Sequence, residues 1–463
     1  MTLSVDSGRP RAVLVGIQLP GVSEEEHNAS LAELGRLVDT LGFDVVGQVS
    51  QKRTHLSSSA GLGGGKLKEL AHWTGGTGVV PSGAKKKIQR KEMHKPSAES
   101  MDDDEDEVED DDFDLGSAKA GPKATVVVVD NELSPSQIRN LERSTGVEVL
   151  DRAGVIIEIF WRHARTKEAQ MQVEIARLTY EAPRLREKES SGDRQRGGGV
   201  GGKGDNQLEI DRHRIRDRIA ELKEKLEEIL ADADNRRQRR SQAMRVALVG
   251  YTNAGKSSLM RALTGSEVLV ADKLFATLGT TMRAIPHTHP KVLISDTVGF
   301  IKNLPHSLVA SFKSTLDEAH DASLLLFVVD ASDANFRSQL EVTKTVLAEI
   351  GAESIPRLLI LNKIDRVEEA QRKKLKREFK DAIQLSALDP DDVARMRKIL
   401  EEHFHATMDE LALAIPFAKT GHVLSFAHEN ARVVSEAWDE DGLKLKVRAP
   451  KETLERLQSL ASG

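Results

Sequence analysis

The segment RVALVGYTNAGKS, residues 245–257, decides how the middle of this chain folds. Its apolar first half predicts a β-strand, and SLMRALTG at 258–265 predicts a helix. The pattern GxxxxGK[ST] between a strand and a helix is typical of a phosphate-binding P-loop, because its glycines let backbone N–H groups curl around phosphate oxygens at a helix N-terminus. Lys256 would place its ammonium on the β- and γ-phosphates, and Ser257 would offer its hydroxyl to Mg²⁺.

Three further motifs follow the ends of predicted strands. DTVG follows KVLIS, so that Asp296 would face the metal and the Gly299 N–H would face the γ-phosphate. NKID follows RLLIL, and Asp365 can accept both guanine N1–H and N2–H₂, which adenine lacks. SAL at 386–388 follows DAIQL and would lend backbone N–H groups to the guanine carbonyl. Four motifs in this order predict a site for GTP and GDP that rejects ATP.

These motifs supply the candidate site residues. The predicted GTP-binding residues are Gly250, Tyr251, Thr252, Asn253, Ala254, Gly255, Lys256, Ser257, Ser258, Asp296, Gly299, Asn362, Lys363, Asp365, Ser386, Ala387 and Leu388. The predicted catalytic residues are Lys256, Thr281 and Gly299, and the predicted Mg²⁺ ligands are Ser257, Thr281 and, through water, Asp296.

The segment KLFATLGTTMR at 273–283 is the predicted switch between the P-loop and DTVG. Thr280 and Thr281 both have a spacing that would let a hydroxyl reach Mg²⁺ when a γ-phosphate is present. The residue after Gly299 is Phe300, where GTPases that position the attacking water with a side chain keep Gln. Either turnover is slow until a partner completes the site, or another group substitutes.

Asn253 lies in the P-loop beside the expected β/γ bridge. Some GTPases of this pattern use such an Asn to hold K⁺ where others place an arginine finger. The structural alternative is that Asn253 only stabilises the loop by a local hydrogen bond. K⁺ is therefore a candidate second ion beside Mg²⁺.

The pattern of strands and helices predicts an α/β chain of four parts. These are an N-terminal α/β domain at 1–160 with a disordered acidic insert at 75–122, a long helical hairpin at 161–243, a Ras-like P-loop G domain at 244–407 and a small α+β domain at 408–463. Apolar seams with spacings of 4, 3, 4 and 3 predict the two hairpin helices: Met171, Ile175, Leu178, Ala182 and Leu185, then Ile215, Ile219, Leu222, Leu226 and Ile229. The glycine-rich tip loop would run over 196–206. In the last part, HVLSFA and LKLKVRA are strand candidates before a final helix.

The composition excludes several classes of protein. The 463 residues would form about three domains at roughly 150 residues each. A net charge of −6 argues against a generally polybasic nucleic-acid coat, so any such contact must come from a local patch. The absence of Cys excludes disulfides, thiol catalysis and cysteine metal sites. The opening MTLSVDSGRP lacks a signal-peptide pattern and no apolar run is long enough to span a bilayer, so we expect a soluble cytoplasmic monomer.

Nearly the whole chain resembles the HflX family of ribosome-associated GTPases. The likeness lies in GYTNAGKS, NELSPSQIRNLE, VEVLDRAGVIIEIF, HARTKEAQMQVEIARLTY, GGGVGGKG with QLEIDRHRIRDRI, LFATLGTTMR and DTVGFI. The resemblance implies binding to the large ribosomal subunit, with dissociation or rescue of stalled ribosomes. The sequence departs from the family at the acidic insert, at Gly279-Thr280, where the family usually reads Asp-Pro, and at Asp205-Asn206 with Ile210.

At the hairpin tip, the glycines allow close backbone approach to another surface, and the flanking cations suit phosphate. Three interpretations compete: a solvated linker, an intramolecular phosphate site and a contact with ribosomal RNA. The candidate RNA contacts are Arg194, Arg196, Gly198, Gly199 and Lys203. Two rival functions also stay open, namely an RNA-binding assembly factor that hardly hydrolyses GTP and a general NTP-driven RNA remodeller.

Overall fold

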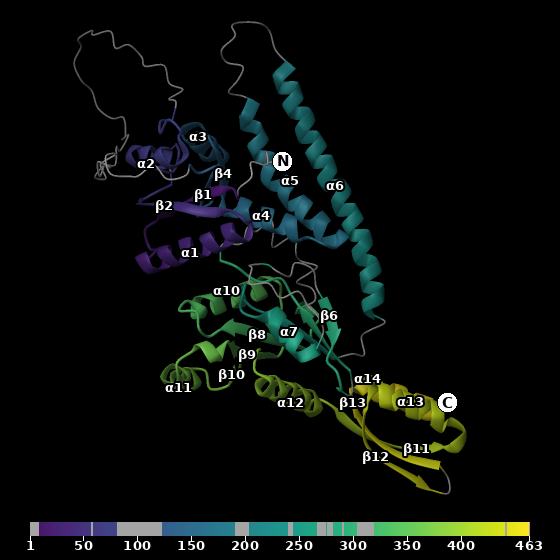
Figure 1. Ribbon diagram of the computed structural model, residues 1–463. Coiled ribbons are helices and arrows are strands. Elements are labelled where there is room, and N and C mark those ends of the chain that lie inside the picture. Colours follow the sequence, from purple (N-terminus) through teal and green to yellow (C-terminus); the bar gives the residue numbers. More distant parts are fainter. Residues whose placement is uncertain are drawn as a thin grey trace, which may run out of the picture. The chain divides into compact units, whose positions relative to one another are not determined.

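The computed structural model describes most of the chain and divides it into two compact units. The described residues are 9–56, 59–80, 123–189, 203–238, 244–265, 275, 281–288, 291–302, 319–439 and 442–462. One unit comprises Met1–Ile159 and Tyr180–Arg212, and the other comprises Phe160–Thr179 and His213–Gly463. Figure 1 labels their helices and strands. The α/β fold class expected from the sequence is confirmed, whereas the boundaries of four domains stay predictions.

The first unit is built on a four-stranded parallel sheet. Its order is β2-β1-β3-β4, with β1 at Arg11–Gln18, β2 at Asp44–Lys52, β3 at Val126–Val129 and β4 at Glu148–Asp151. Its helices are α1 at Glu24–Thr40, α2 at Gly64–Thr74, α3 at Pro135–Thr145 and α4 at Arg152–His163. α2 and α3 pack over one face and α1 lies on the other (Figure 1). Helices α1 and α3 each begin with a capping box, formed by Ser23 with Glu26 and by Ser134 with Gln137.

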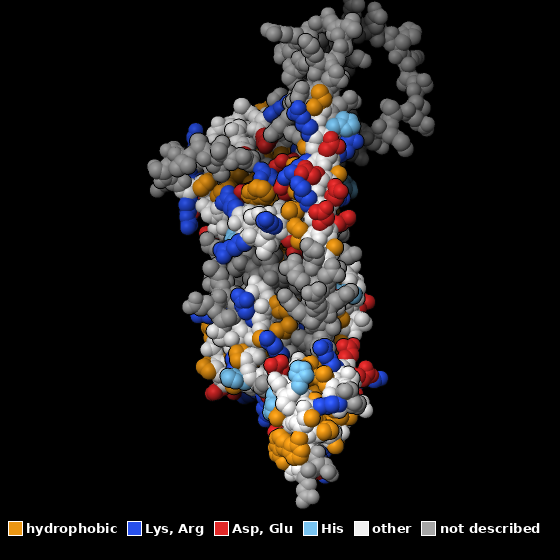
Figure 2. Space-filling view, turned by 90° about the vertical axis from the view of Figure 1, so that its right-hand side faces the viewer, with side chains coloured by type: hydrophobic (Ala, Val, Ile, Leu, Met, Phe, Trp, Pro, Cys, Tyr) orange, Lys and Arg blue, Asp and Glu red, His pale blue; other side chains and the backbone are white. Residues whose placement is uncertain are grey.

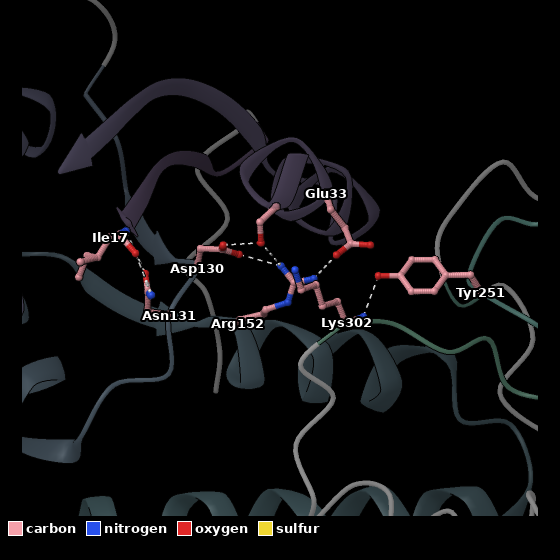
Figure 3. Close-up of polar contacts among 8 residues, drawn as sticks. Ile17, Glu33, Asp130, Asn131, Arg152, Tyr251 and Lys302 are labelled. Carbon is pink, nitrogen blue, oxygen red and sulfur yellow. Dashed lines mark hydrogen bonds and ion pairs between the residues drawn. The ribbon is translucent and has the colours of Figure 1, made fainter. Parts of the chain in front are cut away.

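A buried ion-pair cluster stands at the carboxyl end of this sheet. Arg152, only 2% exposed, donates to Asp130 at 2.7 Å and also contacts Glu33 (Figure 3). Beside it, Asn131 exchanges two hydrogen bonds with the backbone of Ile17, at 2.9 and 3.0 Å. Removing one partner of such a buried pair generally costs about 3–5 kcal/mol, since the other charge is left uncompensated. The cluster therefore fixes the join between β3, α1 and α4.

The predicted acidic insert begins later than expected. Residues 75–80 belong to the fold: Gly75 ends α2 in the left-handed conformation, and Gly78 N–H donates to Ser144 O at 2.9 Å. The expectation that the insert starts at 75 is wrong, because these glycines end a helix and pack on α3. The remainder of the predicted insert, 81–122, lies outside the described residues.

Two long helices follow, α5 at Lys167–Glu189 and α6 at Lys203–Gln238. With 36 residues, α6 is about 54 Å long at 1.5 Å per residue. Leu222, in the predicted seam of α6, is 2% exposed, whereas the exposed side chains of the described part of α6 are mostly Lys, Arg, Asp and Glu. Figure 2 shows Lys and Arg mixed with Asp and Glu on the face that it views. On α5 the most buried face passes through Ala169, Val173 and Ala176, beside the predicted seam. The predicted tip loop is too long at its end, because residues 203–206 already belong to α6.

The G domain has a six-stranded sheet in the order β10-β9-β8-β5-β7-β6. The strands are β5 at Met244–Val249, β6 at Thr281–Ala284, β7 at Val292–Asp296, β8 at Leu324–Asp330, β9 at Arg357–Asn362 and β10 at Ile383–Gln384. Within this sheet, the described strands pair in parallel except for β6 and β7, which are antiparallel. One face is covered by α7 at Lys256–Thr264 and α12 at Pro390–Ala406, and the other by α10 at Phe336–Glu349 and α11 at Glu369–Glu378.

The C-terminal part is a small antiparallel sheet with helices. The order is β11-β13-β12, with β11 at Asp409–Pro416, β12 at Arg432–Asp439 and β13 at Gly442–Ala449. The helices are α13 at Thr420–Asn430 and α14 at Lys451–Ser462. LKLKVRA lies in β13 as expected, but HVLSFA lies in α13, so that strand prediction is wrong. The buried residues Thr420, Val423 and Ala427 are spaced 3 and 4 apart, which is the helical period.

Candidate functional site

The predicted motifs meet at one edge of the G-domain sheet. β5, β7, β8 and β9 run parallel, so their carboxyl ends point the same way. The loop after β5 is the P-loop, β7 ends at Asp296, β8 at Asp330 and β9 at Asn362. This is the arrangement in which open α/β sheets bind ligands.

Two glycines give the P-loop its path. A Cβ on Gly250 would stand 2.1 Å from Val328 O, and one on Gly255 would stand 2.2 Å from Asn362 Nδ2. Gly255 also has a φ of 92°, in the left-handed region. The chain then enters α7 at Lys256. Both glycines are therefore required for two reasons. Residues of β8 and β9 approach the loop too closely for a side chain, and the loop backbone is expected to surround phosphate.

The Lys256 ammonium is held inside the loop. Its side chain is buried, and Nζ donates to Gly250 O at 3.0 Å and to Tyr251 O at 2.8 Å. Burial lowers the pKa of Lys256 to about 8, against the opposing effect of the Asp296 carboxylate. Lys256 therefore loses its proton near pH 8, and a bound phosphate would stabilise its charged form.

Ser257 and Asp296 form the predicted metal end of the site. Ser257 Oγ donates to Asp296 Oδ2 at 2.6 Å, and Asp296 is fully buried. Thr281 is the partner of Asp296 in the β6–β7 pairing, which brings the candidate switch threonine beside both. A hydroxyl, a carboxylate and a second hydroxyl are oxygen donors of the kind that Mg²⁺ takes, so the residues fit that ion.

Phe300 turns its side chain into the core. It is 2% exposed and belongs to the apolar cluster under α10. Its backbone pairs with the P-loop: Phe300 N–H donates to Gly250 O at 3.1 Å, and Thr252 N–H donates to Phe300 O at 2.8 Å. A side chain in this position faces away from the phosphate site. The absence of a water-positioning group here is therefore built into the packing.

A contact that sequence reasoning missed strengthens the same junction. Lys302 N–H donates to the Tyr251 hydroxyl at 2.7 Å, so the second P-loop residue holds the segment after DTVG (Figure 3). Gly299 packs closely against the P-loop, because a Cβ there would stand 2.9 Å from Thr252 Cγ2 and 3.1 Å from Lys256 Nζ. Tyr251 was predicted only as a loop member, and the motif carries no signal for its hydroxyl contact.

The base-reading end is cross-linked to the P-loop. Asn362 Nδ2 donates to Ala254 O at 2.9 Å, and Lys363 Nζ donates to Asn253 O at 2.7 Å. Lys363 also pairs with Asp330 at 2.8 Å. Asp330 was missed by the sequence analysis, although it ends an apolar strand as Asp296 does. The phosphate and base ends of the site are therefore one connected framework.

The Asp365 carboxylate is exposed and has no hydrogen bond or ion pair to any residue that the structure describes. The backbone amides of the SAL motif, in contrast, have protein partners. Ser386 N–H donates to Asp392 at 2.7 Å, Ala387 N–H to Asn362 Oδ1 at 3.1 Å, and Leu388 N–H to Ser386 Oγ at 3.3 Å. A guanine carbonyl would have to share or replace one of these bonds, of which the last is the longest.

Several predicted residues stay untested. Thr280 lies outside the described residues, as do Arg194, Arg196, Gly198 and Gly199, and the side chain of Lys203 is not described. Asn253 is exposed with a φ of 60°, and its side chain makes no hydrogen bond to the part of the chain that the structure describes. No described helix is long and apolar enough to cross a membrane.

Comparisons with known proteins agree with this geometry. Family models match at 28–81 and 114–161, described as "GTP-binding GTPase N-terminal", at 163–240, described as "GTP-binding GTPase Middle Region", and at 245–363, described as "50S ribosome-binding GTPase". "GTPase HflX" of Gluconacetobacter diazotrophicus is 56% identical over 459 residues, covering 98% of each chain. "GTPase HflX" of Escherichia coli K12 is 41% identical over 334 residues, covering 71% of this chain and 78% of the relative.

A GTP-binding protein from Sulfolobus solfataricus in complex with GDP is 24% identical, with a TM-score of 0.42, over 84% of this chain and 99% of that one.

The lowered pKa of Lys256 predicts proton uptake on nucleotide binding. Phosphate charge favours the ammonium form, so the pKa should rise when GDP binds. At pH 8.5, above the pKa of about 8 in the free protein, nucleotide binding should take up most of a proton, and at pH 7.0 it should take up much less. Calorimetry in two buffers of different ionisation enthalpy measures this directly. Above pH 8 the affinity should therefore fall as pH rises.

Lys256→Ala serves as the control for this prediction, because no other P-loop cation can replace the ammonium, and it should lose nucleotide binding. Zero proton uptake by the wild-type protein at pH 8.5 would show that Lys256 is fully charged before the nucleotide arrives.

Proposed function

The chain belongs to the HflX family of GTPases, and on that premise we propose that GTP hydrolysis in its G domain is coupled to binding of the large ribosomal subunit. The observation that carries the proposal is the burial of Phe300, which turns the side chain after Gly299 away from the phosphate site, so that no described residue at this position can orient the attacking water. Efficient turnover then requires a partner. The family model over 245–363 is described as ribosome-binding, which supports the 50S subunit as that partner.

The protein's residues divide the work of nucleotide binding. Lys256 would leave its two carbonyl partners for the β- and γ-phosphate oxygens, and Gly299 would present its N–H to the γ-phosphate. Asp365 would accept both guanine donors. Ser257, Thr281 and, through water, Asp296 would hold Mg²⁺, which supplies positive charge against the phosphates.

The biological role that follows is dissociation or rescue of stalled ribosomes by a cytoplasmic monomer. In this proposal Arg194, Arg196, Gly198, Gly199 and Lys203 contact ribosomal RNA; the first four lie in the sequence between α5 and α6, and Lys203 is the first residue of α6. The boundaries of the four predicted domains belong to the same proposal. The two rival functions are outcomes of the test below: no stimulation by subunits favours an assembly factor, and efficient ATP use favours an RNA remodeller.

We expect multiple-turnover GTP hydrolysis to be slow for the protein alone and to rise at least about tenfold with large ribosomal subunits, because the partner must order the attacking water. A variant with 197–204 replaced by a Ser-rich linker should keep its GDP affinity and lose the stimulation. Small ribosomal subunits are the matched control and should have no effect. Full stimulation of the loop-replaced variant would remove the tip from the proposal, and equal rates with and without large subunits would overturn the coupling itself.

The exposed Asn253 side chain supports K⁺ as a second ion in the bound state. GTP hydrolysis should then be faster in K⁺ than in Na⁺ buffers, up to the roughly 10³–10⁵-fold that an arginine finger supplies at this position. Asn253→Gly keeps the φ of 60° without strain and removes the amide, so it should abolish the difference. Equal wild-type rates in the two salts would assign Asn253 to loop structure alone.

A further inference from the structure

A groove of about 800 Å³ opens beside the base-reading loop of the G domain. Its walls come from α11, from the short edge strand β10 and from the start of α12. Its lining includes four basic side chains that the nucleotide motifs do not use, namely Arg372, Lys376, Lys380 and Arg395, and three acidic ones, Asp365, Asp389 and Asp392. The P-loop lysine, Lys256, is not part of this lining, so the groove offers a second set of cations.

The excess of positive charge lies on one wall of this groove, formed by α11 and the residues beside it, in a chain whose net charge is −6. Residues 366–380 contain seven Lys or Arg and three Asp or Glu. Lys373 is neutralised by Glu369 at 2.9 Å, and Arg395 by Asp392 at 2.7 Å. The remaining exposed cations of α11 and its following loop have no ion pair to any described residue; these are Lys374, Lys376, Arg377 and Lys380. An uncompensated cluster of this kind attracts polyanions.

The walls of the groove are held in place. Arg372 Nε donates to Val367 O at 2.8 Å and its Nη2 donates to Asp365 O at 3.3 Å, which ties the start of α11 to the NKID loop. Gln384 of β10 donates back to Arg372 O at 3.0 Å. At the other end of α11, Glu378 accepts two bonds from Arg337 of α10 at 2.8 and 2.6 Å. The cations are therefore presented on a fixed scaffold, which lowers the entropic cost of binding an anion.

A plain solvated helix face would also be rich in Lys and Arg. Such a face needs neither a cavity nor a backbone tie to the nucleotide loop, and this surface has both. Leu375 anchors α11 in the core at 1% exposure, so Lys376 and Lys380 are carried outward on a packed helix. The concave shape, the uncompensated charge and the fixed walls together suit a phosphodiester backbone, which presents several phosphates at regular spacing.

We propose that the groove between α11, β10 and α12 is a second RNA-binding site, in which Lys376 and Lys380 contact backbone phosphates. The inference rests on the proposed function: if the protein binds the large ribosomal subunit, the polyanion that reaches the groove is ribosomal RNA. It adds a contact on the G domain itself, next to Asp365, whereas the proposed tip contacts follow α5 in the sequence. RNA in this groove and a guanine nucleotide at Asp365 would both contact the NKID loop.

The test compares two double variants of the full-length protein. Lys376→Gln with Lys380→Gln removes groove cations, and Lys373→Gln with Lys374→Gln removes two charges from the same helix outside the groove lining. Binding to large ribosomal subunits is measured by sedimentation over a series of KCl concentrations. Each lost phosphate contact should reduce the magnitude of the slope of log affinity against log salt concentration by about one. The slope of the groove variant should therefore be smaller in magnitude by about two, and the slope of the control variant should change little. Both variants should bind GDP as the wild type does, which shows that they fold.

An unchanged slope in the groove variant, with tight wild-type binding, would overturn the inference and leave the proposed function standing. Equal losses in both variants would overturn it too, because they would indicate a diffuse field rather than a site. If the wild type fails to bind large subunits, the proposed function fails, and the same salt series on a synthetic RNA hairpin tests the groove independently. Displacement of that hairpin by millimolar inorganic phosphate would assign the groove to a small anion and contradict the RNA site.

Discussion

The backbone pairing between the P-loop and the residue after DTVG is the constraint on which the nucleotide site depends. The two hydrogen bonds between Phe300 and the P-loop fix the Gly299 amide beside the Lys256 ammonium. The pairing holds because the Phe300 side chain is anchored in the core under α10. The same packing that places the γ-phosphate contacts therefore removes the side chain that would position water. Binding is prepared within the chain, and in the proposed function a partner completes the arrangement for hydrolysis.

The base-reading end of the site is fixed by hydrogen bonds from the side chains of the NKID motif. Asn362 joins the P-loop at Ala254 to the SAL motif at Ala387, and Lys363 joins it again through Asn253. Asp365 is left as an exposed carboxylate at the end of this framework. Arg372, which lines the groove, donates a hydrogen bond to the backbone oxygen of Asp365. A ligand in that groove would thus touch the loop that reads the nucleotide, and any coupling between them would be reciprocal.

The sequence predicts the local parts of this molecule well because their signals are local. A glycine-rich loop between a strand and a helix, and a capping Ser three residues before Glu26 or Gln137, specify geometry within a few residues. Contacts made across the fold leave no such signal. The inward turn of Phe300, the Tyr251 hydroxyl bond and the Asp330 pairing with Lys363 all depend on where separate strands lie. HVLSFA is predicted as a strand but forms a helix, because a short apolar run is compatible with both the strand period of 2 and the helix period of 3.6.

The central claim is that a single carboxylate, Asp365, makes this nucleotide switch specific for guanine. The most direct measurement is the affinity of the wild type and of Asp365→Asn for GTP and for xanthosine triphosphate. An amide can donate to the carbonyl that xanthine carries in place of the guanine amino group. We expect the variant to lose about 1.5–3 kcal/mol for GTP, on the order of 10–100-fold, and to prefer xanthosine triphosphate. An unchanged preference for GTP in the variant would contradict the account.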